Sequence, residues 1–82
     1  MTKTFHLTIA KVGENLFDGE VVSVLLPGVE GMFEVLASHE ACVSELRKGG
    51  MRVKTEDGQA LEFEAPHGGI AEISQNQATI LI

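Results

Sequence analysis

The sequence predicts an all-β fold, a small antiparallel β-sandwich of about eight to ten short strands in two sheets. Apolar residues keep no helical period except over one short segment, whereas turn-forming residues recur every few positions. With 82 residues, 44% of them hydrophobic, the chain has room for one globular domain, residues 1–82. The turn signals are Gly13, Asp18-Gly19, Pro27-Gly28, Gly31, Gly49-Gly50, Asp57-Gly58, Gly68-Gly69 and Asn76.

Composition excludes several classes of partner. The net charge is −6, which argues against nucleic acid and against anionic lipid, because both need a basic face. No apolar run approaches the ~20 residues that span a bilayer, so we expect no direct membrane insertion. Four Phe are the only aromatic residues, so the core must be aliphatic. An acidic surface of this kind suits a protein partner with basic loops.

The chain contains one cysteine, Cys42. A single cysteine excludes an internal disulfide and a cysteine-based zinc site. Its neighbours Ala41 and Val43 are small and apolar, so Cys42 is interpreted as a small core residue rather than a reactive thiol.

The first two strands differ in pattern. Residues 5–11 alternate between apolar and polar, which predicts a half-buried strand with His6 facing water or a neighbour. Residues 20–26 are apolar on both faces, so this strand is either central or covered by another protein. Pro27 lacks an N–H and is expected to end it. Gly28 and Gly31 then permit the positive φ angles of a surface turn into the next strand.

The secondary structure of residues 38–48 is ambiguous between a helix and an extended segment. Ser38 could cap a helix that Gly49 ends, but the apolar positions make a poor helical stripe. An extended connection is favoured.

Residues 51–65 form the clearest hairpin. A two-residue loop would mix polar and apolar faces, whereas a three-residue loop at 56–58 keeps them apart and puts Gly58 in the left-handed conformation. The expected cross-strand pairs are Met51 with Phe63, Arg52 with Glu62, and Val53 with Leu61. A second hairpin, residues 70–73 and 78–82, closes the chain. Gly68-Gly69 before it is expected to permit a tight bend or a close backbone approach.

No catalytic or nucleotide-binding motif is present. His39, Glu40 and His67 do not have the number or spacing of zinc ligands, so no metal site is predicted. Glu30 and Glu34 join Glu40 in an acidic edge that faces solvent or a partner rather than a catalytic pocket. We therefore predict no catalytic residue, no cofactor and no small-molecule substrate.

Four segments together resemble the epsilon subunit of F-type ATP synthases. Residues 26–39 read LPGVEGMFEVLASH, which is similar to the stretch that links two strands of the family's N-terminal β-sandwich. Residues 5–9 (FHLTI), 16–21 (LFDGEV) and 68–73 (GGIAEI) agree with other family strands in order and spacing. The resemblance covers nearly the whole chain.

The resemblance implies a non-catalytic rotor subunit that joins the gamma subunit to the c-ring, so that proton-driven rotation becomes ATP synthesis. Such a subunit would be peripheral, on the cytoplasmic face of the bacterial inner membrane. The family's two C-terminal helices, which bind nucleotide or inhibit the motor, have no counterpart before the last residue, Ile82, so inhibition is not carried over. The alternative function is a free-standing β-sandwich module that binds a peptide or carbohydrate.

The resemblance also implies contact residues. His39 matches the histidine near the gamma-facing surface. The family commonly has an acid two positions after the Glu that matches Glu30, where this chain has Met32, and Glu34 replaces a family Gly. The expected c-ring contacts are Gly28, Val29, Glu30, Gly31 and Met32.

Overall fold

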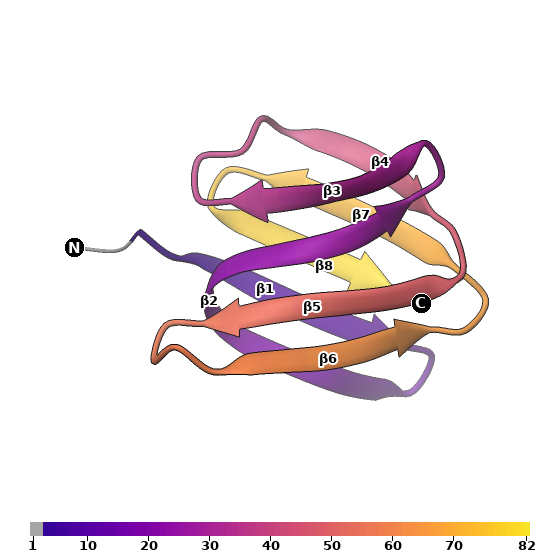
Figure 1. The fold of residues 1–82 in the computed structure, drawn as a ribbon, viewed down its shortest axis with the longest axis horizontal. Helices are drawn as coiled ribbons and strands as arrows, with labels where there is room; N and C mark the ends of the chain where they lie inside the picture. Colours follow the sequence, from indigo (N-terminus) through magenta and orange to yellow (C-terminus); the bar gives the residue numbers. More distant parts are fainter. Residues whose placement is uncertain (1–2) are drawn as a thin grey trace.

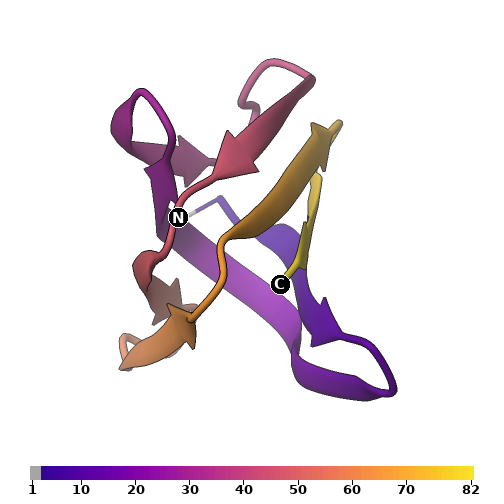
Figure 2. The same ribbon diagram turned by 90° about the vertical axis from the view of Figure 1, so that its right-hand side faces the viewer.

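The computed structural model describes residues 3–82, in which it forms eight β-strands and no helix. This confirms the predicted all-β class. The strands fold into two layers that face one another (Figures 1 and 2). In chain order they are β1 (Phe5–Lys11), β2 (Glu14–Gly28), β3 (Gly31–Leu36), β4 (Cys42–Leu46), β5 (Gly49–Thr55), β6 (Ala60–Ala65), β7 (Gly69–Ser74) and β8 (Gln77–Leu81).

Strand β2 belongs to both layers. The first part of its 15 residues pairs antiparallel with β1, and the later part lies between β3 and β5. A register shift between Val21 and Ser23 marks the change of neighbours. The sequence left open whether residues 20–26 form a central strand or one covered by another protein. The structure shows that they lie in a central strand, β2. Leu25, on its outward face, is 36% exposed.

The remaining pairings complete the two layers. One layer runs β4-β7-β8-β1 into the first part of β2, and the other runs β3-β2-β5-β6. The sequence predicted only antiparallel neighbours, and this is wrong for one pair. Strand β1 pairs with β8 in parallel, because the chain end returns along the free side of β1 after the β7–β8 hairpin.

The core is aliphatic, as the composition predicts. The apolar residues of β1 that alternate with polar ones are all buried, and no polar or charged side chain is buried among residues 3–82. The buried apolar residues are Phe5, Leu7, Ile9, Val21, Val24, Leu26, Val35, Leu46, Met51, Val53, Ala65, Ala71, Ile73, Ala78 and Ile80.

The β5–β6 hairpin has the predicted register. Val53 pairs with Leu61, and Arg52 pairs with Glu62, whose carboxylate accepts a hydrogen bond of 2.7 Å from the guanidinium. Gly58 has a φ of +90°, as the three-residue loop requires. The Thr55 hydroxyl donates to the Asp57 carboxylate in this loop, and that hydrogen bond lowers the pKa of Asp57.

Two sequence expectations near β4 are wrong. Pro27 does not end β2, because its carbonyl still accepts a hydrogen bond from the Arg47 amide (2.8 Å) and no donor is needed there. Cys42 is exposed rather than in the core. Cys42 is the first residue of β4, whereas β4 pairs with β2 only at Leu46, four residues later. At Cys42 the two layers have separated, and the side chain is left open to solvent. Residues 38–48 contain no helix, and the expected extended connection is confirmed.

The Gly68-Gly69 pair permits the close approach that was expected. Gly68 has a φ of +78°, and a Cβ there would lie 2.5 Å from the Leu46 carbonyl oxygen. A Cβ at Gly69 would overlap the Leu81 carbonyl oxygen of the neighbouring strand. Backbone cannot give way as a flexible side chain can, so only glycine fits between these strands.

We expect Gly69→Ala to lower the free energy of unfolding by about 1–3 kcal/mol, because the added methyl forces β7 away from β8. Urea unfolding followed by circular dichroism measures this. Gly50→Ala is the matched control, because its Cβ would meet the flexible end of the Glu64 side chain at 3.3 Å and the Phe63 carbonyl oxygen at an ordinary 3.9 Å. Equal stability of the two variants would contradict the close-approach explanation.

Candidate functional site

The β2–β3 turn is built by two glycines with different roles. Gly28 pairs with Gly31 across a two-residue turn at Val29-Glu30. Gly31 has a φ of +132°, which other residues rarely adopt. Gly28 does not have a positive φ, which corrects the sequence interpretation. A Cβ at Gly28 would instead lie 2.9 Å from the Phe33 ring, so this glycine is required for packing.

The turn is fastened to β4. The Val29 amide donates to the Glu45 carbonyl at 3.0 Å, and Gly28 pairs with Leu46. The Arg47 amide donates to Pro27 in the same place, at 2.8 Å. Because β4 holds the β2 side of the turn and the β2–β3 ladder holds its other side, the turn has little conformational freedom left to lose when it meets a partner.

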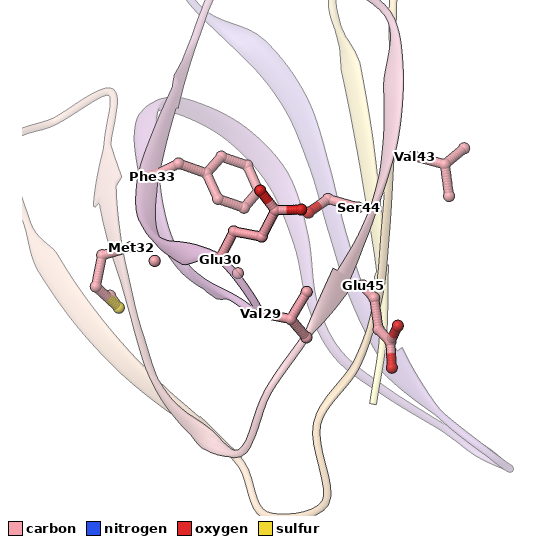
Figure 3. A pocket seen from close by; sticks show the side chains of 9 residues that line it. Val29, Glu30, Met32, Phe33, Val43, Ser44 and Glu45 are labelled. Atoms are coloured by element: carbon pink, nitrogen blue, oxygen red, sulfur yellow. The ribbon is translucent and has the colours of Figure 1, made fainter.

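An open hollow of about 550 Å³ lies between this turn and β4 (Figure 3). Its rim is apolar, since Val29, Met32 and Val43 are 50%, 48% and 69% exposed. Glu30 and Glu45 are the two charged residues among those that border it. Figure 3 shows the Glu30 side chain turned toward β4. We call the nine residues around it the turn hollow: Gly28, Val29, Glu30, Gly31, Met32, Phe33, Val43, Ser44 and Glu45.

The chemistry of the turn hollow suits contact with a protein surface. No Lys or Arg lines it, so its two carboxylates give it a negative potential. Within residues 3–82 no three His, Cys, Asp or Glu residues are grouped so as to hold a metal ion. The described part of the chain also has no helix capable of crossing a membrane.

The structure brings the five predicted ring-facing residues together and adds four that were missed, of which Phe33 is on β3. Val43, Ser44 and Glu45 lie on β4, which the sequence interpretation treated only as a connection. Of the predicted acidic edge, Glu30 lines the turn hollow. Glu34 faces outward opposite Leu25, and Glu40 is exposed in the β3–β4 connection.

His39 lies apart from the turn hollow. It follows β3 at the end opposite the turn, about 17 Å along the strand at 3.4 Å per residue. Its amide donates to the Leu36 carbonyl (3.1 Å), and its Nδ1 lies 2.8 Å from the Glu40 carbonyl, to which it donates. Ser38, with a φ of +72°, turns the chain so that the ring is only half-buried, next to the β7–β8 turn.

Sequence comparison places this geometry in a family. A family model described as the β-sandwich domain of the ATP synthase delta/epsilon chain matches residues 4–82. The ATP synthase epsilon chain of Chlorobium limicola is 34% identical over 79 residues, which is 96% of this chain and 89% of the relative. That of Protochlamydia amoebophila is 39% identical over 77 residues, 94% of this chain and 52% of the relative.

Structure comparison agrees. A chain of the Euglena gracilis mitochondrial ATP synthase, in a structure of its OSCP, F1 and c-ring, superposes with a TM-score of 0.89 at 26% identity. The match covers 95% of this chain and 49% of that chain, so this chain spans about half of its length. A chain of the Tetrahymena thermophila enzyme shares the fold, with a TM-score of 0.74 at 11% identity. The protein therefore belongs to the ATP synthase delta/epsilon chain family and comprises its β-sandwich domain.

Proposed function

We propose that the protein is a non-catalytic central-stalk subunit of an F-type ATP synthase, which links the gamma subunit to the c-ring. Its family membership and its relatives' name, ATP synthase epsilon chain, support this proposal. Because the c-ring is embedded in the membrane, such a subunit works peripherally, at the cytoplasmic face of the bacterial inner membrane. The proposal includes no cofactor, no small-molecule substrate and no nucleic acid.

The observation that carries the proposal is the placement of two surfaces on one stiff body. The turn hollow and His39 lie at opposite ends of β3, and the Gly28–Leu46 bridge ties the turn to the other layer. A subunit that transmits torque needs separate contact surfaces held at a fixed distance. Two layers of strands around a continuous aliphatic core supply that stiffness.

The c-ring side requires a partner of particular chemistry. Exposed Val29 and Met32 beside Glu30 and Glu45 fit a loop that carries Lys or Arg next to apolar groups. The family's usual acid at the position of Met32 is missing from the turn. Glu45 of β4 is a second acidic residue beside the hollow, on the far side of β4 from Glu30 (Figure 3), so a negative charge is also present on the neighbouring strand.

The alternative, a module that binds a peptide or carbohydrate on its own, has less support. Sugar sites use exposed aromatic faces, whereas Phe33 is the one aromatic residue of the turn hollow and is half-buried against Gly28. The relatives found by comparison are ATP synthase subunits. Glycan and peptide arrays probed with the intact chain would support this alternative if a specific ligand were found.

The proposed function is tested by mixing the chain with purified gamma subunit and, separately, with detergent-solubilised c-ring. We expect a complex with gamma at micromolar concentration in size-exclusion chromatography. Absence of any complex with gamma, with c-ring and with the two together would overturn the proposal.

We expect Glu30→Lys with Glu45→Lys to weaken c-ring binding by about tenfold or more, because the hollow then repels a basic loop. Gamma binding should not change. The control is Glu34→Lys with Glu64→Lys, which makes the same change in net charge at exposed positions of β3 and β6 that do not line the turn hollow. Biolayer interferometry at two salt concentrations measures both. Equal weakening by the two double variants would contradict a specific contact at the turn hollow.

His39→Asp should weaken gamma binding and leave c-ring binding unchanged, since a carboxylate at this site cannot donate to the Glu40 carbonyl and adds a negative charge next to Glu40. His67→Asp is the matched control, because His67 is an exposed histidine in the β6–β7 connection. If the two histidine variants bind gamma equally well, His39 does not contact gamma.

A further inference from the structure

A histidine held between two carboxylates lies on the outward face of β1 and β2. His6 Nδ1 is 3.1 Å from a Glu20 oxygen, and its Nε2 hydrogen-bonds to Asp18. The Thr4 hydroxyl donates to the other Glu20 oxygen at 3.0 Å, and the Thr8 hydroxyl is 3.3 Å from Asp18. The sequence left open whether His6 faces water or a neighbour, and the structure shows a partly exposed ring that contacts side chains of the neighbouring strand. We call His6, Asp18 and Glu20 the histidine clamp.

Strand register places the clamp. His6 is directly opposite Glu20, and Asp18 is opposite Thr8, two residues along β1. Residues two apart in a strand share a face, so Asp18 and Glu20 stand on either side of the ring. The buried neighbours Phe5 and Leu7 fix this face outward. The ring therefore has one carboxylate at each nitrogen.

This arrangement has consequences for protonation. A neutral imidazole has one N–H and one lone pair, so one of its nitrogens would face a carboxylate with no proton between them. The imidazolium has two N–H donors and satisfies both carboxylates. The hydrogen bond to Asp18 is the largest cause that raises the pKa of His6 above its ordinary value, and the hydrogen bond to Glu20 is the next.

No cation competes for these carboxylates from the neighbouring strands. On the other side of β1, the residues of β8 opposite His6 and Thr8 are the uncharged Gln77 and Thr79. Lys11, at the far end of β1, pairs instead with Glu14, at 3.5 Å. Loss of the His6 proton therefore leaves two carboxylates on one short stretch of β2 with no cation among the residues of β1 and β8 opposite them.

We propose that the histidine clamp is a proton-dependent tie, which strengthens the pairing of β1 with β2 while His6 is protonated and weakens when His6 loses its proton. The strand that it holds is structurally important. β1 pairs with both β2 and β8, and its residues Leu7 and Ile9 are fully buried in the core. The inference concerns this chain alone and does not rest on the proposed function.

The sign of the pH dependence follows from linkage. The pKa of His6 is higher in the folded chain than in the unfolded one, so the folded state holds the proton more tightly. The stabilisation is fully present below the unfolded pKa, near 6.5, and is lost as pH rises through the folded pKa. The β1–β2 ladder should therefore loosen on the alkaline side and tighten on the acidic side.

NMR titration of His6 in the intact chain tests the tie directly. We expect His6 to titrate at higher pH in the folded chain than in the same chain unfolded by urea. Near the unfolded pKa, long-range ¹H–¹⁵N spectra should show both ring nitrogens protonated. Asp18→Asn with Glu20→Gln should move the titration down to the unfolded value. Titration of His6 at the same pH in both states would overturn the proposal.

Two further measurements separate the tie from general charge effects. Glu34→Gln with Glu64→Gln removes the same charge from the other layer and should leave the His6 titration unchanged. Urea unfolding is measured from about pH 5 to about pH 9 for the unmodified chain and for His6→Gln. The urea midpoint of the unmodified chain should exceed that of the variant, by an amount that decreases as pH rises. A difference in urea midpoint that stays constant with pH would refute the tie. So would a control variant that moves the His6 titration as far as Asp18→Asn with Glu20→Gln does.

Discussion

Continuity of strand β2 is the constraint on which the rest of the structure depends. Its 15 residues pass from one layer to the other without a loop, and the register shift near Val21 lets one strand serve two sets of neighbours. Val21, Val24 and Leu26 are fully buried, so the crossing passes through the core itself. A change that bends or shortens β2 would therefore disturb both layers at once.

The features linked to function lie along this strand. The histidine clamp is on its first part, and the turn hollow begins at its last residue, Gly28. Neither is an enclosed pocket. Each is an outward arrangement whose geometry comes from the ladder beneath it, which is what an adaptor between two larger bodies requires. The fastening of the turn to β4 adds the only β2–β4 pairing seen in residues 3–82, and it fixes the turn relative to the opposite layer.

Local pattern was sufficient for the fold class and for the β5–β6 register, because only one loop length keeps Val53 and Leu61 on the same face. It failed where tertiary contacts decide. Cys42 has apolar neighbours in sequence, but it lies at the start of β4, and β2 contacts β4 only at its last residue, Leu46. Pro27 stays within β2 because Arg47 supplies the donor. Glu45 reaches the turn hollow from another strand, and no local pattern in the sequence encodes that contact.

Native-state hydrogen exchange of the β2 amides tests the central claim most directly. If β2 joins the layers into one cooperative unit, hydrogen-bonded amides in its first and later parts should exchange through the same global opening, with equal free energies and equal dependence on denaturant. Core amides of β5 should join them. If the later part of β2 and β5 instead open together at a clearly lower free energy than the first part, the layers are separable and the account of a single stiff body is wrong.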